Sequence, residues 1–422
     1  MITHFYSRVI LACFILLCAV TACKKDNAFQ HNAGAPITIT RILPETGGKG
    51  TDVLISGTNF SEDKTTITVT LNGVACEVVG ANATSILIKI PAKAGSGPIA
   101  VTISDKKVAS EASFRYISSK RVITLAGSGD LGYQDSPDSL ASKFYFYDQP
   151  GLTVDADGNL FVTDDGNHII RKVSAQGVTT TSSGTKSSGG YVNGKGAEVR
   201  FNLPTDIDRD EAGNMYVADR WNSAIRKIAP DGTVSTLAAI GDPTGVGVDK
   251  KTGNIYAACP GYKNLYQIKP DGSLLQIPVT FDTPVDVAVD SHGNLLVVDY
   301  GASTIEKITA GTWQKTTLAG TRGKYGLVNG AGGSAEFNGA TGIVIDRNDN
   351  VYIADRSNHC IRFIDAATNE VSTLAGSSES GYQDGEDINA RFNYPAQLAL
   401  DKVGNLYVTD RNNRRIRKVI IE

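Results

Sequence analysis

The sequence predicts an all-β protein in which an immunoglobulin-like sandwich precedes a six-bladed β-propeller. Two observations carry this prediction. A unit of alternating apolar and polar residues recurs six times between residues 151 and 419, and Gly- and Asn-rich turns divide each copy. Ahead of it, residues 36–117 show short strands between Gly and Asn turns at a different spacing. Each repeat of this kind is one supersecondary unit, and neighbouring units bury a continuous core together.

The repeat is easiest to follow in its last copy, residues 395–419. An apolar run ends in Asp401, a Gly-Asn turn follows, a second apolar run ends in Asp410, and a third run completes the copy. Alternation with a period of two predicts strands, and Gly-Asn tolerates the positive φ of a tight hairpin. A fourth strand follows each of the first five copies, so we expect four-stranded antiparallel blades.

The sixth copy has no fourth strand of its own before Glu422. Residues 121–127, Arg-Val-Ile-Thr-Leu-Ala-Gly, have the fourth-strand pattern but precede the first copy. We expect this strand to complete the sixth blade, because closure leaves the ring without an open edge. The predicted propeller therefore covers residues 121–422.

The repeated pattern Asp-x-x-Gly-Asn-Leu-Tyr-Val-Ala-Asp-x-x-Asn-His-x-Ile-Arg resembles the NHL repeat. Copies one, two, five and six follow it well, including His168 and His359. Copy three departs at Cys259, where the second-strand Asp is expected, and copy four has Ala302 in place of the Asn. The resemblance implies a six-bladed NHL-type propeller.

Residues 36–117 resemble the IPT/TIG domain, an immunoglobulin-like fold. The resemblance rests on Pro44-x-x-Gly-Gly and on the later pattern Val53-x-Ile-x-Gly-x-Asn59-Phe60. Such domains usually act as spacers or adhesion modules in cell-surface proteins. The segment carries no constellation of titratable residues, so no chemistry is assigned to it.

Residues 1–22 resemble a bacterial lipoprotein signal peptide. Arg8 precedes an apolar run that is too short to span a bilayer. The following Val20-Thr-Ala-Cys23 resembles a lipobox and implies that Cys23 carries the lipid that attaches the protein to the membrane. An ordinary signal peptide or an uncleaved anchor is the alternative.

Residues 23–35 form a polar tether. Its Lys24-Lys25-Asp26 resembles the charged signals of Bacteroidetes surface lipoproteins, although a solvated linker explains it equally well. We expect an outer-membrane lipoprotein at the cell surface, with the periplasmic side as the alternative.

Composition and cysteine spacing exclude several function classes. The formal net charge is −3 and no basic face is evident, which argues against nucleic-acid binding. Cys76, Cys259 and Cys360 lie far apart without metal-ligand spacing, so we expect free thiols, although an export compartment permits a disulfide. Residues 127–132 satisfy GxGxxG, but no helix follows, so a dinucleotide site is not expected.

Four long loops precede inner strands and are expected on the face that also carries the turns between second and third strands. A rim of unequal loops on a rigid scaffold is typical of a binding face. Sugar rings stack on aromatic side chains while polar groups bind their hydroxyls, which favours a carbohydrate ligand, with a partner protein as the alternative. Rings buried under their own loops are the structural alternative. The candidate ligand-binding residues are Tyr133, Tyr191, Arg220, Trp221, Tyr325, Arg356, Tyr382 and Arg411.

The Asp that ends five of the second strands is expected to cap the following turn and pair with nearby Arg220, Arg356 or Arg411; a ring of carboxylates is the alternative. At the starts of the inner strands, Gly alternates with Asp206, Asp286 and Gln397. These polar residues at the channel mouth could hold a cation, with calcium the candidate at Asp206 and Asp286, or a hydroxylated ligand. Ordered water in the channel explains them equally well.

Two function classes follow. The favoured one is a tethered, non-catalytic binding protein with the IPT/TIG segment as its spacer. The other is a metal-dependent hydrolase or lyase of the lactonase or esterase type that acts at the channel mouth. This alternative is implied by the resemblance to six-bladed propellers that are enzymes of these types. The sequence specifies no Ser-His-Asp set and no paired-carboxylate geometry, so no catalytic residue is assigned.

Overall fold

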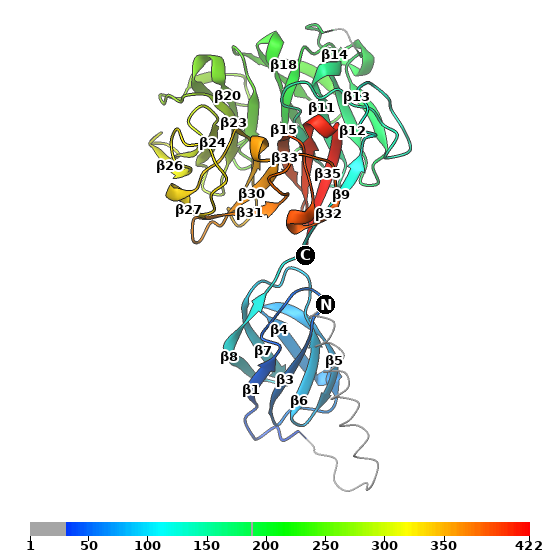
Figure 1. Cartoon of the computed structure of the whole chain (residues 1–422), viewed down its shortest axis with the longest axis vertical. Coiled ribbons are helices and arrows are strands. Elements are labelled where there is room, and N and C mark those ends of the chain that lie inside the picture. Colours follow the sequence, from blue (N-terminus) through cyan, green and yellow to red (C-terminus); the bar gives the residue numbers. More distant parts are fainter. Residues whose placement is uncertain (1–30, 187–188) are drawn as a thin grey trace. The chain divides into compact units, whose positions relative to one another are not determined.

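The computed structural model describes residues 31–186 and 189–422. These residues form strands joined by turns and short 3-10 helices, as expected for an all-β protein. Two compact units are present: the first ends at Ser119 and the second is Lys120–Ile421 (Figure 1). Within the described ranges, no helix is long and apolar enough to cross a membrane. The signal peptide, the lipobox and Cys23 lie outside the described residues.

The first unit is a β-sandwich around one apolar core. Phe60, Ile55, Val101 and Phe114 are fully buried in this core. Strands β1-β3-β6-β5 form one run of neighbours and β4-β7-β8 the other, and the short β2 is parallel to β8. The strands are β1 (Thr38–Leu43), β2 (Thr46–Gly47), β3 (Asp52–Thr58), β4 (Ile67–Leu71), β5 (Val74–Asn82), β6 (Ser85–Lys89), β7 (Gly97–Ile103) and β8 (Lys106–Tyr116), with the 3-10 helix η1 (Lys64–Thr66) before β4.

The Gly-x-Asn-Phe pattern has a local structural explanation. A Cβ at Gly57 would lie 2.0 Å from the Thr38 carbonyl oxygen, so only glycine allows this close approach of β1. Asn59 has a positive φ of 59°, and its side-chain amide donates to the Asn32 and Ala35 carbonyls. These bonds hold the segment before β1 against the sandwich.

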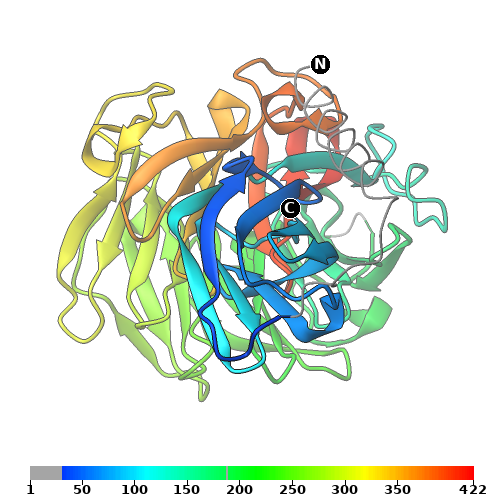
Figure 2. The ribbon, with the colours of Figure 1, turned by 90° about the horizontal axis from the view of Figure 1, so that it is seen from below.

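The second unit is the predicted six-bladed propeller, each blade an antiparallel meander (Figures 1 and 2). Blade 1 contains β10 (Leu152–Val154), β11 (Leu160–Asp164), β12 (Ile169–Val173) and β13 (Thr179–Ser183). Blade 2 contains β15 (Pro204–Arg209), β16 (Met215–Asp219), β17 (Ala224–Ile228) and β18 (Thr233–Ala239). Blade 3 contains β19 (Gly245–Val248), β20 (Ile255–Cys259), β21 (Asn264–Ile268) and β22 (Leu274–Gln276).

The remaining blades follow around the ring in chain order, from yellow through orange to red in Figure 2. Blade 4 contains β23 (Pro284–Val289), β24 (Leu295–Asp299), β25 (Thr304–Ile308) and β26 (Lys315–Ala319). Blade 5 contains β28 (Ala340–Ile345), β29 (Val351–Asp355), β30 (Cys360–Ile364) and β31 (Glu370–Ala375). Blade 6 contains β33 (Pro395–Leu400), β34 (Leu406–Asp410), β35 (Arg415–Ile421) and β9 (Lys120–Ala126).

The ring closes as predicted. Strand β9 pairs antiparallel with β35, with Val122 opposite Val419 and Ala126 opposite Ile416, and it lies beside β35 in Figure 1. Val122 is fully buried in the core of blade 6. The first strand of this unit therefore supplies the outer strand of its last blade.

A repeated buried arginine on the third strand joins the loops to the blades. Arg226, with no exposed surface, donates to Asp219 at 2.7 Å, to Asn193 at 2.7 Å, and to the carbonyls of Val192 and Arg200. Arg171, Arg362 and Arg417 make the same set of contacts in blades 1, 5 and 6.

This arrangement corrects one expectation. The second-strand Asp was expected to pair with the arginine of the following turn, but the structure pairs it with the third-strand arginine seven residues on. Strand pairing sets this partner, because Val217 lies opposite Arg226, two residues before Asp219. The Asp side chains point into their blades and form no ring of carboxylates.

The long loops cover the outer edges of the blades that they precede. The short strand β14 (Gly194–Lys195) pairs with β18, β27 (Gly330–Ala331) with β31, and β32 (Gly385–Glu386) with β9. The Phe of each loop (Phe144, Phe201, Phe337 and Phe392) is fully buried next to the repeated arginine. These loops therefore protect strand edges that would otherwise be open.

Candidate functional site

The structure separates seven of the eight candidate ligand-binding residues into two groups. Tyr133, Tyr191 and Tyr382 lie over the buried arginines of blades 1, 2 and 6, with 5.0–5.1 Å from guanidinium carbon to ring centroid. The hydroxyl groups of Tyr133 and Tyr382 are hydrogen-bonded to Thr181 and Thr124 on outer strands. These rings belong to the outer parts of different blades because each covers its own arginine, so they do not form the shared aromatic rim that was expected.

Arg220, Trp221, Arg356 and Arg411 follow the second strands of three blades and do come together. They belong to the 3-10 helices η4 (Arg220–Asn222), η7 (Arg356–Asn358) and η9 (Arg411–Asn413). The residue after each helix adopts the left-handed conformation, which turns the chain back into the third strand. The starts of these turns are thereby presented at one end of the propeller axis.

We call the residues gathered at this end the axial cluster. Loops before the inner strands contribute to it as well as the 3-10 helices and the turn after β24. Its members are Tyr147, Asp148, Arg220, Trp221, Tyr300, Arg356, Tyr394 and Arg411.

Arg220 links three blades within the cluster. Its guanidinium group forms ion pairs with Asp148, before blade 1, and with Asp242, before blade 3, the latter at 2.7 Å. Arg411 donates from Nε to the Tyr147 carbonyl at 3.1 Å. These bonds hold the Tyr147–Asp148 segment against blades 2 and 6.

Arg356 is different, because its guanidinium group makes no hydrogen bond or ion pair with any residue that the structure describes. Its Nε atom is buried without a partner, and its guanidinium carbon lies 5.5 Å from the Tyr394 ring centroid. Burial, followed by the like charge of Arg411, lowers the pKa of Arg356. Asp148 acts in the opposite direction, but its ion pair is with Arg220.

The aromatic members leave ring surface open to solvent. Tyr147 is 49% exposed and Trp221 57% exposed, and their ring centroids lie 6.4 Å apart in an edge-to-face arrangement. Tyr300 is 40% exposed on the blade 4 side. Exposed rings next to guanidinium groups provide both stacking surface and hydrogen-bond donors.

Asp165 positions the Tyr147–Asp148 segment of the cluster through hydrogen bonds to its backbone. It occupies the place in blade 1 that Arg220, Arg356 and Arg411 occupy in other blades, but its side chain is fully buried. Its carboxyl oxygens accept the Tyr147 N–H at 2.8 Å and the Asp148 N–H at 2.7 Å. Burial raises the pKa of Asp165 to about 7.

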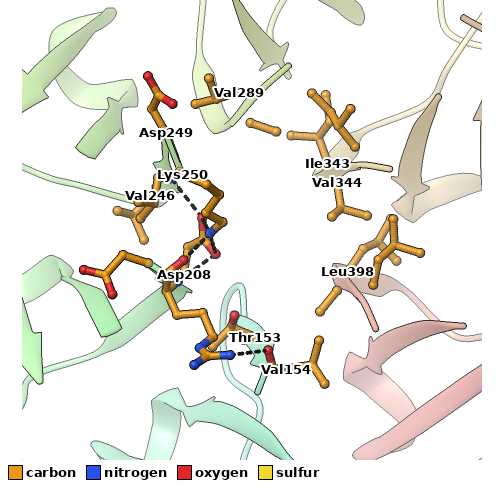
Figure 3. Close-up of a pocket in the computed structure, with 18 of the residues that line it drawn as sticks. Thr153, Val154, Asp208, Val246, Asp249, Lys250, Val289, Ile343, Val344 and Leu398 are labelled. Atoms are coloured by element: carbon orange, nitrogen blue, oxygen red, sulfur yellow. Dashed lines mark hydrogen bonds and ion pairs between the residues drawn. The ribbon is translucent and has the colours of Figure 1, made fainter. Parts of the chain in front are cut away.

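The propeller also contains an axial cavity of about 710 Å³. Figure 3 shows side chains of the inner strands, including Val246, Val344 and Leu398, arranged around its open centre. The lining continues into the turns after the inner strands, where Lys250 pairs with Asp208 at 2.9 Å. Because inner strands run from the looped face to the opposite one, the cavity opens opposite the axial cluster.

Asp206, Asp286 and Gln397 were expected together at a channel mouth, and the structure does bring them together, but at the inner end of this cavity. They come from blades 2, 4 and 6, and all three are at least 94% buried. These three side chains explain why glycine alternates with them around the ring, since each one occupies the space that a Cβ of the glycine would need. A Cβ at Gly151, Gly245 or Gly342 would lie within 2.6 Å of the Asp206, Asp286 or Gln397 side chain.

The two carboxyl groups tie neighbouring blades together. Asp206 accepts the Val246 N–H at 2.8 Å, and Asp286 accepts the Ile343 N–H at 2.9 Å. Burial raises the pKa of Asp206 to about 7, and burial together with the charge of Asp206 raises that of Asp286 well above its usual value. The described residues hold no group of three or more His, Cys, Asp or Glu side chains suited to a metal ion. Calcium at this position stays a prediction.

Other sequence candidates have structural roles. His168 and His359 accept backbone N–H groups of Leu203 and Tyr394 through Nδ1, at 2.9 and 3.2 Å. Cys259 and Cys360 are buried and Cys76 is half-buried, and all three are free thiols. Tyr325, the eighth candidate ligand-binding residue, belongs to neither group: it is 60% exposed in the loop before blade 5.

Sequence reasoning missed Tyr147, Asp148, Tyr300 and Tyr394. Tyr147, Asp148 and Tyr394 precede inner strands and Tyr300 follows β24, at positions where the repeat pattern has no fixed residue. A signal was available in Tyr145-Phe-Tyr147-Asp148, because two tyrosines in a short inter-blade segment depart from the other copies.

Comparison with known proteins agrees with this architecture. Residues 36–116 match the IPT/TIG domain, and residues 337–362 match the NHL repeat. The chain therefore contains both modules. The chloroplast protein SUPPRESSOR OF QUENCHING 1 of Arabidopsis thaliana is 26% identical over 312 residues, which are 71% of this chain but 27% of that protein. The chain thus spans about a quarter of that relative.

Two solved structures extend the comparison to both units. A Bacteroides thetaiotaomicron protein of unknown function has a TM-score of 0.69 at 19% identity, covering 93% of this chain and all of that one. An auxiliary nutrient binding protein from Bacteroides ovatus has a TM-score of 0.60 at 22% identity, with the same coverage. At these identities the likeness concerns the fold.

Proposed function

We propose that this protein is a surface-tethered lipoprotein that captures a carbohydrate at the axial cluster. The observation that carries the proposal is the meeting of exposed Tyr147 and Trp221 with the guanidinium groups of Arg220, Arg356 and Arg411 around the propeller axis. Sugars offer apolar ring faces to aromatic side chains and hydroxyl groups to charged donors. The cluster suits such a ligand better than a purely apolar one.

The remaining modules fit a display role. Lipidation at Cys23 would attach the chain to the outer membrane, and the IPT/TIG domain would act as the spacer between membrane and propeller. The name of the Bacteroides ovatus protein, auxiliary nutrient binding protein, is in keeping with a capture role. A protein partner on the same face is the alternative ligand.

A second candidate function is a hydrolase or lyase, favoured by the paired carboxyl groups of Asp206 and Asp286 with their raised pKa values. A carboxyl group that is protonated near neutral pH can act as a general acid. In this proposal the reaction would take place in the axial cavity.

The test is affinity electrophoresis of the full-length protein in detergent on a panel of polysaccharides. We expect retardation by at least one glycan, lost in Trp221→Ala and in Tyr147→Ala. Tyr325→Ala is the matched control, because Tyr325 is equally exposed but belongs to the loop before blade 5. Its retardation should equal that of the wild type.

The same incubations are assayed for reducing ends and unsaturated sugars. If products form with the wild type and not with Asp286→Asn, the result would support the hydrolase or lyase function instead of the capture function. Absence of retardation on every glycan would contradict carbohydrate capture and leave a protein ligand as the better explanation.

A further inference from the structure

The positive and negative charges of the axial cluster do not balance. The cluster contains three guanidinium groups. Its ion-paired carboxylates, Asp148 and the neighbouring Asp242, are both bonded to Arg220. Within the described part of the chain, neither Arg356 nor Arg411 has a carboxylate within 4.0 Å.

The two remaining guanidinium groups also act on each other. Arg356 lies 5.5 Å from the ring of Tyr394, and the N–H of Asn412, next to Arg411, donates to the carbonyl of Asn393, next to Tyr394, so both arginines flank the same inter-blade segment. In keeping with this geometry, the positive charge of Arg411 disfavours the charged form of Arg356. Arginine nevertheless stays charged in proteins, because its intrinsic pKa is so high. Two neighbouring guanidinium groups that have no carboxylate partner in the protein attract an anion, and an anion that contacts both is favoured most.

Arg356 is also held ready for such a ligand. Its Nε is buried and unpartnered, and Tyr394 supports the group from one side at 5.5 Å. A planar guanidinium with free donors binds a carboxylate or sulfate through two parallel hydrogen bonds. The contact with Tyr394 and the burial of Nε restrict the Arg356 side chain, so less side-chain freedom is lost on binding.

The aromatic rings lie on the adjoining side of the cluster. Arg411 donates to the Tyr147 carbonyl, and the Tyr147 ring contacts Trp221 edge to face. A ligand with an anionic group at Arg356 and Arg411 would therefore place a neighbouring sugar ring over Tyr147 and Trp221. An acidic peptide would match the charges but would leave these exposed rings unused.

We propose that the axial cluster selects acidic carbohydrates, in which a carboxylate or sulfate carried by a sugar bridges Arg356 and Arg411. This inference rests on the carbohydrate capture proposed above and adds the charge of the ligand. Arg220, already neutralised by two carboxylates, serves to hold the site together.

The experiment measures affinities by isothermal titration calorimetry with the full-length protein in detergent. The probes are a galacturonic acid tetrasaccharide, its fully methyl-esterified form, a sulfated galactose tetrasaccharide and a glutamate tetrapeptide. We expect the free acid to bind at least tenfold more tightly than its ester, since esterification removes the negative charges while the sugar rings and their hydroxyl groups stay the same. Raising the salt concentration should weaken binding of the acid but not that of the ester.

Substitutions at Arg356 distinguish loss of the positive charge from loss of folding stability. Arg356→Ala should weaken binding of the acid at least tenfold and change binding of the ester less than twofold. Because the Arg356 guanidinium makes no hydrogen bond in the described structure, this variant should melt like the wild type. Arg356→Lys keeps the charge but loses the planar fork, so we expect an intermediate affinity. Arg391→Ala is the control, since Arg391 is 43% exposed and pairs with Glu379 in the loop before blade 6.

Each outcome decides the proposal. Arg356-dependent binding of the sulfated sugar supports it and extends the anion to sulfate. Equal affinity for acid and ester, unchanged affinity in Arg356→Ala, or tighter binding of the peptide than of both acidic sugars would overturn it. Retardation by a neutral glycan that requires Trp221, without preference for the acid, would overturn this inference alone. Failure of every glycan to bind would overturn the proposed function with it.

Discussion

The repeated arginine of the third strand holds a second strand, a long loop and an aromatic plug together in one blade. In blade 2, Arg226 and Asp219 have no exposed surface, and Arg226 lies between the rings of Tyr191 and Phe201. A buried charge pair of this kind depends on both partners, because either one alone leaves an uncompensated charge. The arginine and the long loop are also missing together: in blade 4, Glu306 stands in place of the arginine, and the long loop is absent.

We therefore predict that Arg226→Leu lowers the free energy of unfolding by about 3–5 kcal/mol, since Asp219 stays buried without its cation. Urea unfolding followed by circular dichroism measures the change. The control Arg391→Ala, at a partly exposed arginine, should stay within about 0.5 kcal/mol of the wild type. A loss below about 1 kcal/mol in Arg226→Leu would show that Asp219 does not depend on this partner.

Asp206 is a residue whose effect on stability depends on pH. Its pKa is raised to about 7 by burial, so the folded protein keeps a proton that the unfolded chain releases near pH 4. Between these values the folded state binds more protons than the unfolded state, and stability falls as pH rises. The contribution is complete below pH 4 and is lost as pH passes 7.

Asp206→Asn should reduce this fall in stability by up to about 1.4 kcal/mol per pH unit between pH 4 and 7. The measurement is the free energy of unfolding at several pH values for both proteins. Asp231→Asn serves as the control, because Asp231 is fully exposed and its pKa is lowered rather than raised. An unchanged slope in Asp206→Asn would contradict the raised pKa.

At the scale of elements, one strand decides whether the ring is closed. Strand β9 satisfies the edge of β35 along six residue pairs and buries Val122 in the core of blade 6. Blades 1, 2, 5 and 6 have their outer strands further covered by the long loops. Among the described residues, the outer strands of blades 3 and 4 have no such added segment.

Deletion of residues 121–127 should abolish the cooperative thermal transition and cause aggregation, because it opens the β35 edge and removes the buried Val122. Calorimetry and light scattering record the two effects. Arg121→Ser is the control, since Arg121 is an exposed residue of the same strand and the substitution leaves its backbone pairing in place. A deletion variant that melts as the wild type does would mean that the ring closes in another way.

At the scale of the whole molecule, the two ends of the propeller axis have different chemistry. The looped end carries aromatic rings and guanidinium groups, whereas the opposite end opens into a cavity with apolar walls and charged turns. The proposed capture function also requires attachment of the chain to the membrane through Cys23.

Cys23→Ser should therefore abolish lipid labelling and release the protein from the membrane fraction. Labelling with a radioactive fatty acid, followed by fractionation, measures both effects. Cys76→Ser, which changes a thiol of the sandwich, should remain labelled and membrane-bound. A Cys23→Ser protein that stays in the membrane fraction would contradict the lipobox interpretation.

The repeat pattern alone predicted the blades and the closing strand, since strand periodicity and turn residues are local properties. Local pattern also placed Asp206, Asp286 and Gln397 near one another, because equivalent positions of a ring lie around one axis. Only the tertiary structure decided which side chains meet. Tyr133, Tyr191 and Tyr382 turn to their own buried arginines, whereas Arg356 contacts Tyr394 and has no hydrogen-bond partner for its guanidinium group among the described residues. Contacts between side chains of different blades depend on how the blades pack, so the residue spacing within a single repeat does not predict them.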